Sequence, residues 1–345
     1  MNSKHLLWLL VIISAIALMG CEGETGPAGV AGVDGADGAD GANGTSLAVC
    51  LDCHTDAPFL QIGLEYVQSG HKAGNYVDYA GGRGSCSRCH SKQGFMNFAA
   101  GIDAADIGEP SEIDCATCHI VHPTDEFVLR MDGPVPMIWD ETYMLDFGDD
   151  SNLCANCHQS RRAEPNISDP GDTFEITSTH YGPHHGAQAN VLEGVGFAEI
   201  AGSTAYPAPS SGSGHLSAGG DGVTCVDCHM DAYTEGVGGH TWWPSIDACT
   251  GCHQGAEDFD INGAQTENHE KLVALRDRLV ALGVVEYVEE DEAYEPVVGT
   301  YPMVQAQAFF NWIGLEEDRS LGAHNPGYFE ALLDNTLEAL EAPTF

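Results

Sequence analysis

The amino-acid sequence predicts a mostly irregular chain with short α-helices, which ends in a longer helical segment. Three observations predict this fold class. Glycine, serine, proline and aspartate interrupt residues 48–260, where they favour turns over regular elements. The same region contains six copies of the pentapeptide Cys-x-x-Cys-His, whereas the composition would give roughly 0.02 matches by chance. Beyond Asn262, apolar residues recur with the spacing of a helix.

The six pentapeptides contain twelve of the thirteen cysteines. Cys-x-x-Cys-His is the attachment signature of c-type haem, because its cysteines bond to the vinyl groups and its histidine binds the iron. The sequence therefore predicts six covalent c-type haems. The cysteines expected to hold them are Cys50, Cys53, Cys86, Cys89, Cys115, Cys118, Cys154, Cys157, Cys225, Cys228, Cys249 and Cys252. The histidines expected on the proximal side of the iron are His54, His90, His119, His158, His229 and His253.

Three other uses of the cysteines fit the pattern less well. A zinc ribbon needs two Cys-x-x-Cys pairs for each metal and gives no reason for a histidine after every pair. A thioredoxin-like redox motif would be single and would lie between a strand and a helix. A disulfide framework requires neither the short spacing nor the histidines.

Residues 1–20 are predicted to be a lipoprotein signal peptide. Lys4 precedes an apolar stretch from Leu6 to Met19, which has the length of a secretory signal and is too short for a membrane span. Gly20 and Cys21 then resemble a bacterial lipobox, so Cys21 is expected to be the lipidated first residue of the mature chain. The alternative is an ordinary cleaved signal followed by a stray thiol, which would be unusual in an exported protein.

Residues 21–47 are predicted to be a flexible spacer. Glycine occupies every third position from Gly23 to Gly44, with alanine and aspartate at most of the others. This is the period of collagen, but Pro27 is the only proline, and a stable triple helix needs many more. The spacer would join the lipid to the haem region.

The chain is strongly acidic, with 52 acidic and 12 basic residues and a formal net charge of −40. Nucleic-acid binding is not expected, because a phosphate backbone requires a basic face. The negative field would attract cations and basic protein surfaces. The alternative is that the charge serves only solubility.

Residues 48–260 are the predicted hexahaem region. A segment of this length has few residues for each porphyrin and cannot build a normal protein core. The apolar faces of stacked haems are therefore expected to supply most of the buried surface. The protein without haem should then remain largely unfolded, as small domains do without their metal.

Residues 261–345 are predicted to form a helical C-terminal region that packs on the haem region. Thr266 is expected to cap a first helix, and Val304 to Leu315 to form a second. An acidic stretch, residues 286–295, separates the two. Asn325 and Pro326 are expected to be the cap and the first residue of a third helix.

Each iron needs a second, distal ligand, and nine histidines remain besides the motif histidines and His5. His269, on an apparently amphipathic helix, is the weakest candidate. The predicted distal ligands are His71, His122, His180, His184, His185, His215, His240 and His324. Methionine is the alternative ligand, at Met96, Met131, Met144 or Met230. Arg161 and Arg162, after the fourth motif, would neutralise its haem propionates or would face solvent.

The motifs, the Gly-x-x spacer and the lipobox together resemble hexahaem and other multihaem c-type cytochrome lipoproteins of the bacterial cell envelope. Residues 318–328 resemble the closing segment of nitrite-reductase-like multihaem cytochromes, in which a histidine returns to a haem. That resemblance favours His324 as a ligand. Glu22 after the lipidated cysteine favours the outer membrane, with the cell surface and the periplasmic face as the alternatives.

The resemblance implies electron transfer among six haems, with other cytochromes or extracellular acceptors as partners. The alternative function is a multihaem oxyanion reductase, of the nitrite or tetrathionate type, with one open-site haem. Nitrite reductases of this kind commonly mark their catalytic haem with Cys-x-x-Cys-Lys, which does not occur here. A non-catalytic electron carrier is therefore favoured. Assembly into a homo-oligomer or filament stays open beside a tethered monomer.

Overall fold

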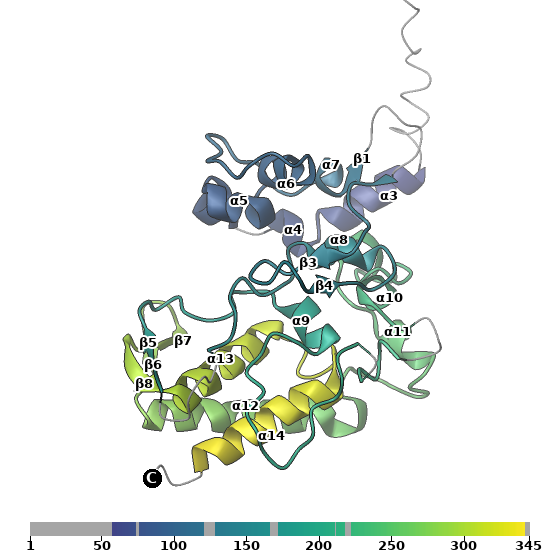
Figure 1. Cartoon of the computed structure of the whole chain (residues 1–345). Coiled ribbons are helices and arrows are strands. Elements are labelled where there is room, and N and C mark those ends of the chain that lie inside the picture. The colour runs from purple at the N-terminus through teal and green to yellow at the C-terminus, as the bar shows by residue number, and fades with distance from the viewer. Residues whose placement is uncertain are drawn as a thin grey trace, which may run out of the picture. The chain divides into compact units, whose positions relative to one another are not determined.

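The computed structural model describes residues 57–73, 76–120, 128–165, 172–210, 212–217 and 222–341 (Figure 1). The sequence predictions for the signal peptide, the spacer and Cys21 lie outside these residues. The first motif, with Cys50, Cys53 and His54, and the candidate ligand His122 also lie outside them.

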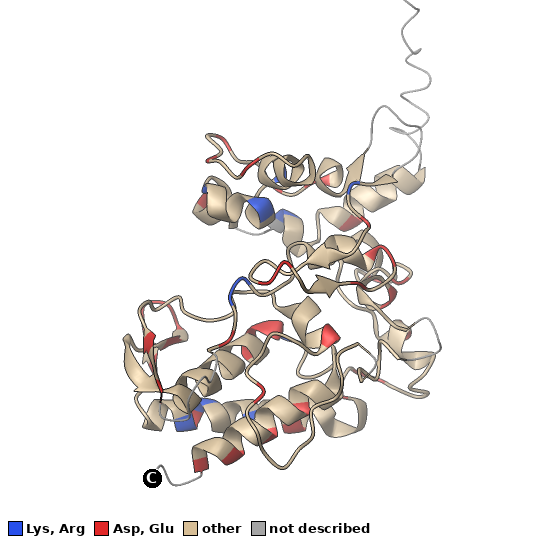
Figure 2. Cartoon of the chain, in the orientation of Figure 1, with Lys and Arg blue, Asp and Glu red and all other residues tan. Residues whose placement is uncertain are grey.

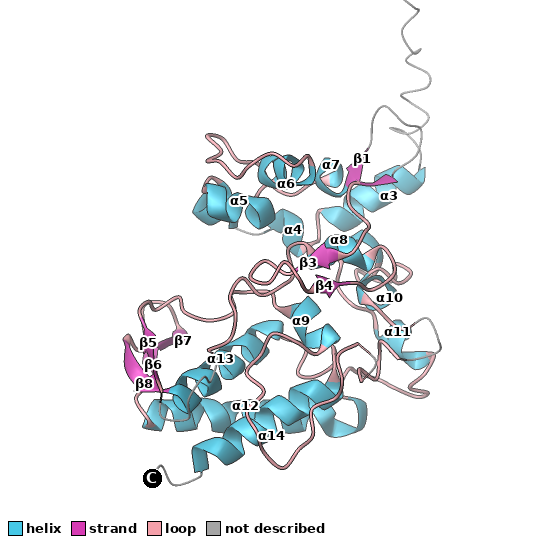
Figure 3. Ribbon diagram, in the orientation of Figure 1, coloured by secondary structure: helices cyan, strands magenta, loops and turns pink. Residues whose placement is uncertain are grey.

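Short helices joined by irregular segments make up the described part of the haem region, as the sequence predicts (Figure 3). None of these helices is longer than ten residues among those described. They are α3 (Ala57–Tyr66), α4 (Gly70–Ala73), η1 (Val77–Gly81), α5 (Gly84–His90), α6 (Lys92–Ala99), α7 (Cys115–Cys118), α8 (Ser151–Ala155), α9 (Gln188–Glu193), α10 (Cys225–His229), η2 (Gly239–Thr241) and α11 (Ile246–Thr250).

Eight short strands form four antiparallel pairs among the described residues. Three of the pairs join segments that are near in sequence, and β5 with β8 joins the haem region to the C-terminal region. The pairs are β1 (His119–Ile120) with β2 (Val128–Leu129), β3 (Val135–Pro136) with β4 (Met144–Leu145), β5 (Thr173–Ile176) with β8 (Gly299–Pro302), and β6 (Val285–Val288) with β7 (Ala293–Pro296).

Three longer helices follow the short 3-10 helix η3 (Ile261–Gly263): α12 (Ala264–Ala281), α13 (Met303–Asp318) and α14 (Pro326–Glu341). The predicted second helix is confirmed and is longer than expected. The predicted cap of α14 is also confirmed, because Asn325 Oδ1 accepts a hydrogen bond from the Tyr328 amide at 3.2 Å. The predicted cap of α12 is wrong: the helix begins before Thr266, whose amide and hydroxyl both donate to the Asp260 carboxylate.

The main hydrophobic core lies among α12, α13 and α14 and includes residues of the haem region. Leu275, Phe309 and Leu332 come from the three helices and are fully buried. Tyr181 and Phe197 reach the same core from the segment before the fifth motif. The apolar stripes of the helices therefore pack both against each other and against the haem region.

A second, smaller core lies inside the haem region, where the sequence predicts none. Val135, Met137 and Leu145, from the β3–β4 hairpin, pack with Ala155 of α8 and Leu192 of α9. This cluster buries the helix that carries the first cysteine of the fourth motif. The expectation that this region cannot build a protein core is therefore wrong at this place, and the expectation that porphyrin faces supply most of its buried surface stays a prediction. Within the described residues, no helix has the length and apolar character of a membrane span.

Candidate haem-binding sites

Each of the five described motifs forms a helical turn. Motif residues lie within α5, α7, α8, α10 and α11, and the turn continues beyond α8 and α11 through bonds from the His158 and His253 amides to the carbonyls of Cys154 and Cys249. Residues three apart on a helix share one face, so each turn presents its two cysteines together. All ten cysteines of these motifs are free thiols. They are therefore available for thioether bonds.

Capping boxes hold two of these short helices, which are too short to be stable by themselves. At α7, the Asp114 carboxylate accepts from the Ala116 amide at 3.0 Å, and the Thr117 hydroxyl binds the Asp114 amide. At α10, the Thr224 amide donates to the Asp227 carboxylate at 2.8 Å. Both caps fix the first cysteine of a motif directly after the capping residue.

Cys118 and Cys228 do not have the chemistry of a thioredoxin-like site. A redox-active cysteine of that kind needs a lowered pKa, which keeps it as a thiolate at neutral pH. Burial instead raises the pKa of Cys118 and of Cys228 to about 11. These two side chains are neutral thiols at neutral pH.

Every described motif histidine lies opposite a histidine from outside the motifs. The distances between ring centroids are closely similar in the five pairs, from 6.0 to 6.5 Å. The pairs are His90 with His184 at 6.0 Å, His119 with His240 at 6.3 Å, His158 with His71 at 6.2 Å, His229 with His324 at 6.3 Å, and His253 with His215 at 6.5 Å.

This spacing fits an iron held between two imidazoles. A metal-to-imidazole bond is about 2 Å long, and a ring centroid lies about 1 Å beyond the bonding nitrogen, so two rings on opposite sides of one iron have centroids roughly 6 Å apart. Direct packing of two rings does not require the same distance five times. The residues present therefore fit bis-histidine c-type haem, with one histidine of each pair supplied by the attachment motif.

Two of the histidines that face a motif histidine are held in the neutral form that can bind a metal. Burial, with a smaller contribution from His158, lowers the pKa of His71 to about 4. Burial and the nearby Arg161 lower the pKa of His184 to about 3. Both imidazoles therefore keep a lone pair for the iron at neutral pH.

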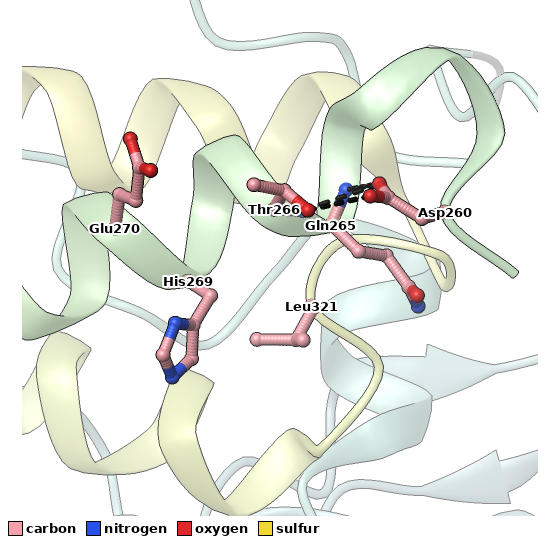
Figure 4. A pocket seen from close by; sticks show the side chains of 6 residues that line it. All are labelled: Asp260, Gln265, Thr266, His269, Glu270 and Leu321. Atoms are coloured by element: carbon pink, nitrogen blue, oxygen red, sulfur yellow. Dashed lines mark hydrogen bonds between the residues drawn. The ribbon is translucent and has the colours of Figure 1, made fainter.

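The remaining candidate histidines that the structure describes, His180, His185 and His269, are not opposite a motif histidine. His180 is exposed, and His185 is 77% exposed and forms an ion pair with Glu317 at 2.6 Å. His269, the weakest candidate, is exposed on α12 beside a shallow pocket (Figure 4). In that pocket, Asp260 is already bound to Gln265 and Thr266.

Three ring hydrogen bonds orient paired histidines from behind. His229 Nδ1 lies 2.8 Å from the carbonyl oxygen of Trp242, and His158 Nδ1 lies 3.2 Å from Gln188 Oε1. His324 Nδ1 lies 2.7 Å from the Asp318 carboxylate. Partners of this kind fix the orientation of a ligating ring and set its basicity. The sequence analysis identified none of them.

Trp242 contacts histidines of three pairs. Its ring lies edge-on to His71 at 4.7 Å and to His240 at 5.4 Å, and its carbonyl faces His229. The residue has a φ of 54°, a left-handed conformation that is costly outside glycine. That backbone conformation belongs to the turn after η2, and the same residue thus presents its ring and its carbonyl to different pairs.

The second and fourth motifs are in direct contact. The Arg88 guanidinium, between the cysteines of the second motif, donates to the carbonyl of Asn156 in the fourth at 3.1 Å. The thiols of Cys89 and Cys157 are hydrogen-bonded to each other, and this bond lowers the pKa of Cys89 and raises that of Cys157. These contacts join segments 68 residues apart in sequence.

The fourth motif also adjoins the fifth. The Ser151 hydroxyl at the start of α8 donates to the Thr224 hydroxyl at 3.0 Å and accepts from the Val226 amide at 3.1 Å. The third motif approaches the fourth as well, since Cys118 lies close enough to raise the pKa of Cys157. The fourth motif thus has three other motifs as neighbours.

The arginines after the fourth motif lie near the histidine pair of the second motif, His90 and His184. Arg161 lowers the pKa of both His90 and His184, and its amide donates to the carbonyl of Pro183 at 2.8 Å. Arg162 lies 5.9 Å from the Tyr181 ring. Arg161 is thus close to the His90 and His184 pair, which belongs to the second motif. Its predicted role at the propionates of the fourth haem stays a prediction.

Comparison with known proteins gives relatives of one kind. The c-type polyhaem cytochrome OmcC of Geobacter sulfurreducens is 26% identical over an alignment that covers 70% of this chain and 38% of that protein. OmcB of the same species is 26% identical, with 68% and 38% covered. The chain thus matches less than half the length of these curated relatives. No family model matches the sequence.

A crystal structure of the outer cell wall cytochrome OcwA is also similar, with a TM-score of 0.47 and 21% sequence identity. It covers 80% of this chain, which covers 50% of that one. None of these proteins is named as a nitrite reductase, so the resemblance of residues 318–328 to such enzymes stays a prediction. In its motifs and in its sequence relatives, the chain is similar to multihaem c-type cytochromes.

Proposed function

We propose that the chain is an electron-transfer protein with six covalent c-type haems, which relays electrons at the cell envelope or to extracellular acceptors. When bound, c-type haem supplies one-electron redox chemistry at each site. The residues of this chain provide the thioether bonds and the axial imidazoles, and they hold neighbouring sites in contact. The redox partners would be other cytochromes or acceptors outside the cell.

The observation that carries this proposal is the opposition of two histidines at all five described motifs. We assign His71, His184, His215, His240 and His324 as the distal ligands of these sites. With haem bound, the two imidazoles of each pair would both hold the iron and would leave no position for a substrate. Such a site can gain and lose an electron without binding a substrate.

The alternative is an oxyanion reductase with one open-site haem. The five described pairs argue against an open position at the second to sixth motifs. An open site would then belong to the first motif, Cys50 to His54, with His122 as the candidate that would close it. Electron transfer is favoured, because the sequence has the histidine to spare and has no Cys-x-x-Cys-Lys motif.

The same proposal includes export and a lipid anchor. It is supported by the signal-like residues 1–20, by Cys21 after Gly20, and by the need of c-type haem attachment for an extracytoplasmic compartment. Mass spectrometry of the mature N-terminus tests it. A diacylated or triacylated Cys21 is expected, and a free Cys21 thiol would rule out the anchor.

The test of function is a haem count followed by carbon monoxide titration of the reduced protein. Six haems per chain are expected by the pyridine haemochrome assay, with negligible carbon monoxide binding. Binding of one carbon monoxide per chain would contradict the saturated relay and favour the reductase. A count of five or fewer in fully processed protein would contradict the assignment of all six motifs.

A further inference from the structure

A buried carboxylate lies directly behind one of the paired histidines. Asp318 Oδ1 is 2.7 Å from His324 Nδ1, and the side chain of Asp318 has no exposed surface. Its other oxygen, Oδ2, accepts from the amide of Ser320 at 3.3 Å and from the hydroxyl of the same residue. The carboxylate therefore has no solvent shell and is held by the protein alone.

The loop between α13 and α14 keeps the two side chains together. Asp318 is the last residue of α13, and His324 lies two residues before α14 begins. Between them, Arg319, Leu321 and Gly322 have φ values of 60°, 50° and 99°. Three left-handed residues in four define a tight backbone path, which non-glycine residues adopt only when the surrounding structure imposes it. The contact is thus built into the loop.

Other paired histidines have different partners. His229 faces a backbone carbonyl and His158 faces a side-chain amide, and both acceptors are neutral. His240 Nδ1 is 4.0 Å from Glu65, beyond hydrogen-bond distance, because the Glu65 carboxylate binds the His240 amide instead. His324 therefore differs from these three in having an anionic acceptor within hydrogen-bond distance.

An anionic acceptor changes what the imidazole does to a metal. The hydrogen bond to a carboxylate shifts electron density onto the ring, so the ring becomes a stronger donor and favours the oxidised, more positive iron. A buried negative charge acts in the same direction, and it is screened little in a region without water. Both effects disfavour the arrival of an electron.

We propose that Asp318 is a positioning residue that makes the haem of the Cys225–His229 motif harder to reduce than it would be if a neutral side chain accepted the hydrogen bond of His324. This inference rests on the proposed function, because it requires His324 to be the distal ligand of that haem. Asp318 touches the ligand and acts through it.

The test replaces the carboxylate by its neutral isostere, Asp318→Asn, and measures all haem potentials by spectroelectrochemistry. The amide oxygen can still accept the hydrogen bond from His324, so this contact is retained while the charge is lost, although the amide nitrogen cannot accept from Ser320 as Oδ2 does. One haem in the set should become easier to reduce, by roughly tenfold in its reduction equilibrium. The matched control is Glu317→Gln, which removes the same charge one residue away, where the carboxylate pairs with the exposed His185.

A shift of one haem in Asp318→Asn and none in Glu317→Gln supports the proposal. Unchanged potentials, or equal shifts in both variants, would overturn it. If Asp318→Asn does not incorporate its haems, near-infrared magnetic circular dichroism of the unaltered protein replaces it. One charge-transfer band displaced toward that of an imidazolate ligand is then expected, and bands that all match neutral imidazole would refute the inference.

A separate variant distinguishes failure of this inference from failure of the proposed function. His324→Ala should create one carbon monoxide binding site per reduced chain, because it removes a distal ligand. If it creates none, His324 is not a ligand and the assignment of that site is wrong. If it creates one while Asp318→Asn leaves the potentials unchanged, only the role of Asp318 is wrong.

Discussion

His180, His184 and His185 lie within six residues of each other, yet only His184 faces a motif histidine. The backbone explains the selection. His184 has a φ of 81°, which places it in a left-handed turn after Pro183, whose carbonyl binds the Arg161 amide. His185 then points to Glu317 and His180 to solvent. The sequence alone predicts that this segment supplies one or two ligands, but the turn decides which.

His184→Gly should open one iron to an external ligand. Glycine suits the positive φ at this position, so the substitution removes the imidazole without backbone strain. We expect one carbon monoxide bound per reduced chain, measured by the Soret difference spectrum. His180→Ala is the control and should bind none. Carbon monoxide binding in the control and not in His184→Gly would reverse the assignment.

Some residues of each site could be predicted from the sequence, and others could not. The motif residues follow from the pentapeptide itself, because its spacing already encodes attachment and the proximal ligand. The distal partner does not, since His71 and His158 are 87 residues apart and no local rule relates them. Asp318 and Trp242 were also missed. Their roles depend on a loop conformation and on a carbonyl, which residue type does not reveal.

At the scale of elements, the C-terminal helices could be read from the sequence and the strands could not. The stripe from Val304 to Leu315 predicts α13 because apolar residues with a helical period need a buried face. The β5–β8 pair joins residues 173–176 to residues 299–302, and such distant partners leave no local signal. The β6–β7 hairpin was overlooked because its glutamates and aspartates identified the stretch only as acidic.

Asn311 of α13 bonds to the backbone of the haem region through its amide side chain. Asn311 accepts from the Ala198 amide at 2.9 Å and donates to the Ala198 carbonyl at 2.8 Å, and it also bonds to Thr336 of α14 at 3.0 Å. Its side chain is fully buried. One residue thus satisfies both backbone groups of an irregular segment that has no strand partner.

Asn311→Leu should lower the free energy of unfolding of the C-terminal region by about 1–3 kcal/mol, because the buried Ala198 amide loses its partner and the Ala198 carbonyl keeps only the Ile200 amide. Urea denaturation followed by far-ultraviolet circular dichroism measures the change. Thr336→Val keeps the shape and removes one hydrogen bond, so it should cost only about 1 kcal/mol. Equal losses in the two variants would show that the Ala198 contacts contribute little.

At the scale of the whole molecule, the main hydrophobic core contains more buried apolar side chains than the smaller core of the haem region. The core of α12, α13 and α14 is built from protein side chains such as Phe310, Tyr328 and Leu333. The described motif helices are only four to seven residues long, and α8 lies in the smaller core of the β3–β4 hairpin. The expectation that the haem-free chain is largely unfolded therefore applies more to the described residues before 130, which lie outside both cores, than to the end of the chain.

A variant with serine at all twelve motif cysteines tests this expectation. Limited proteolysis should cut it first between residues 57 and 130, while a fragment that contains α12 to α14 persists. Short helices without a covalent partner are unstable, whereas the C-terminal helices keep a core of their own. Rapid digestion of the whole chain, or resistance throughout, would contradict the expectation.

The net charge of −40 should govern encounters with basic redox partners. Figure 2 shows acidic residues over most of the described elements and few basic ones. The rate of electron exchange with a basic monohaem cytochrome c should fall by about tenfold or more between low and high salt, because screening removes the attraction. Stopped-flow kinetics measures it, and a neutral mediator is the control. Equal salt dependence for both would show that no attraction operates.

The three neighbours of the fourth motif have a consequence for the routes that electrons can take through the protein. Hydrogen bonds lead from Arg88 of the second motif to Asn156 and from Ser151 to Thr224 before the fifth, and Cys118 of the third motif lies near enough to Cys157 to raise its pKa. If the haems formed one linear row, a haem that could not pass on its electron would block transfer along the whole row. A site with three neighbours behaves differently, since an electron that arrives from one neighbour can leave to either of the other two, and blocking one of them leaves the other available. Among the described motifs, the site at His158 would thus be a crossing of three routes, while Lys92 and Asp114 join the second motif to the third without it.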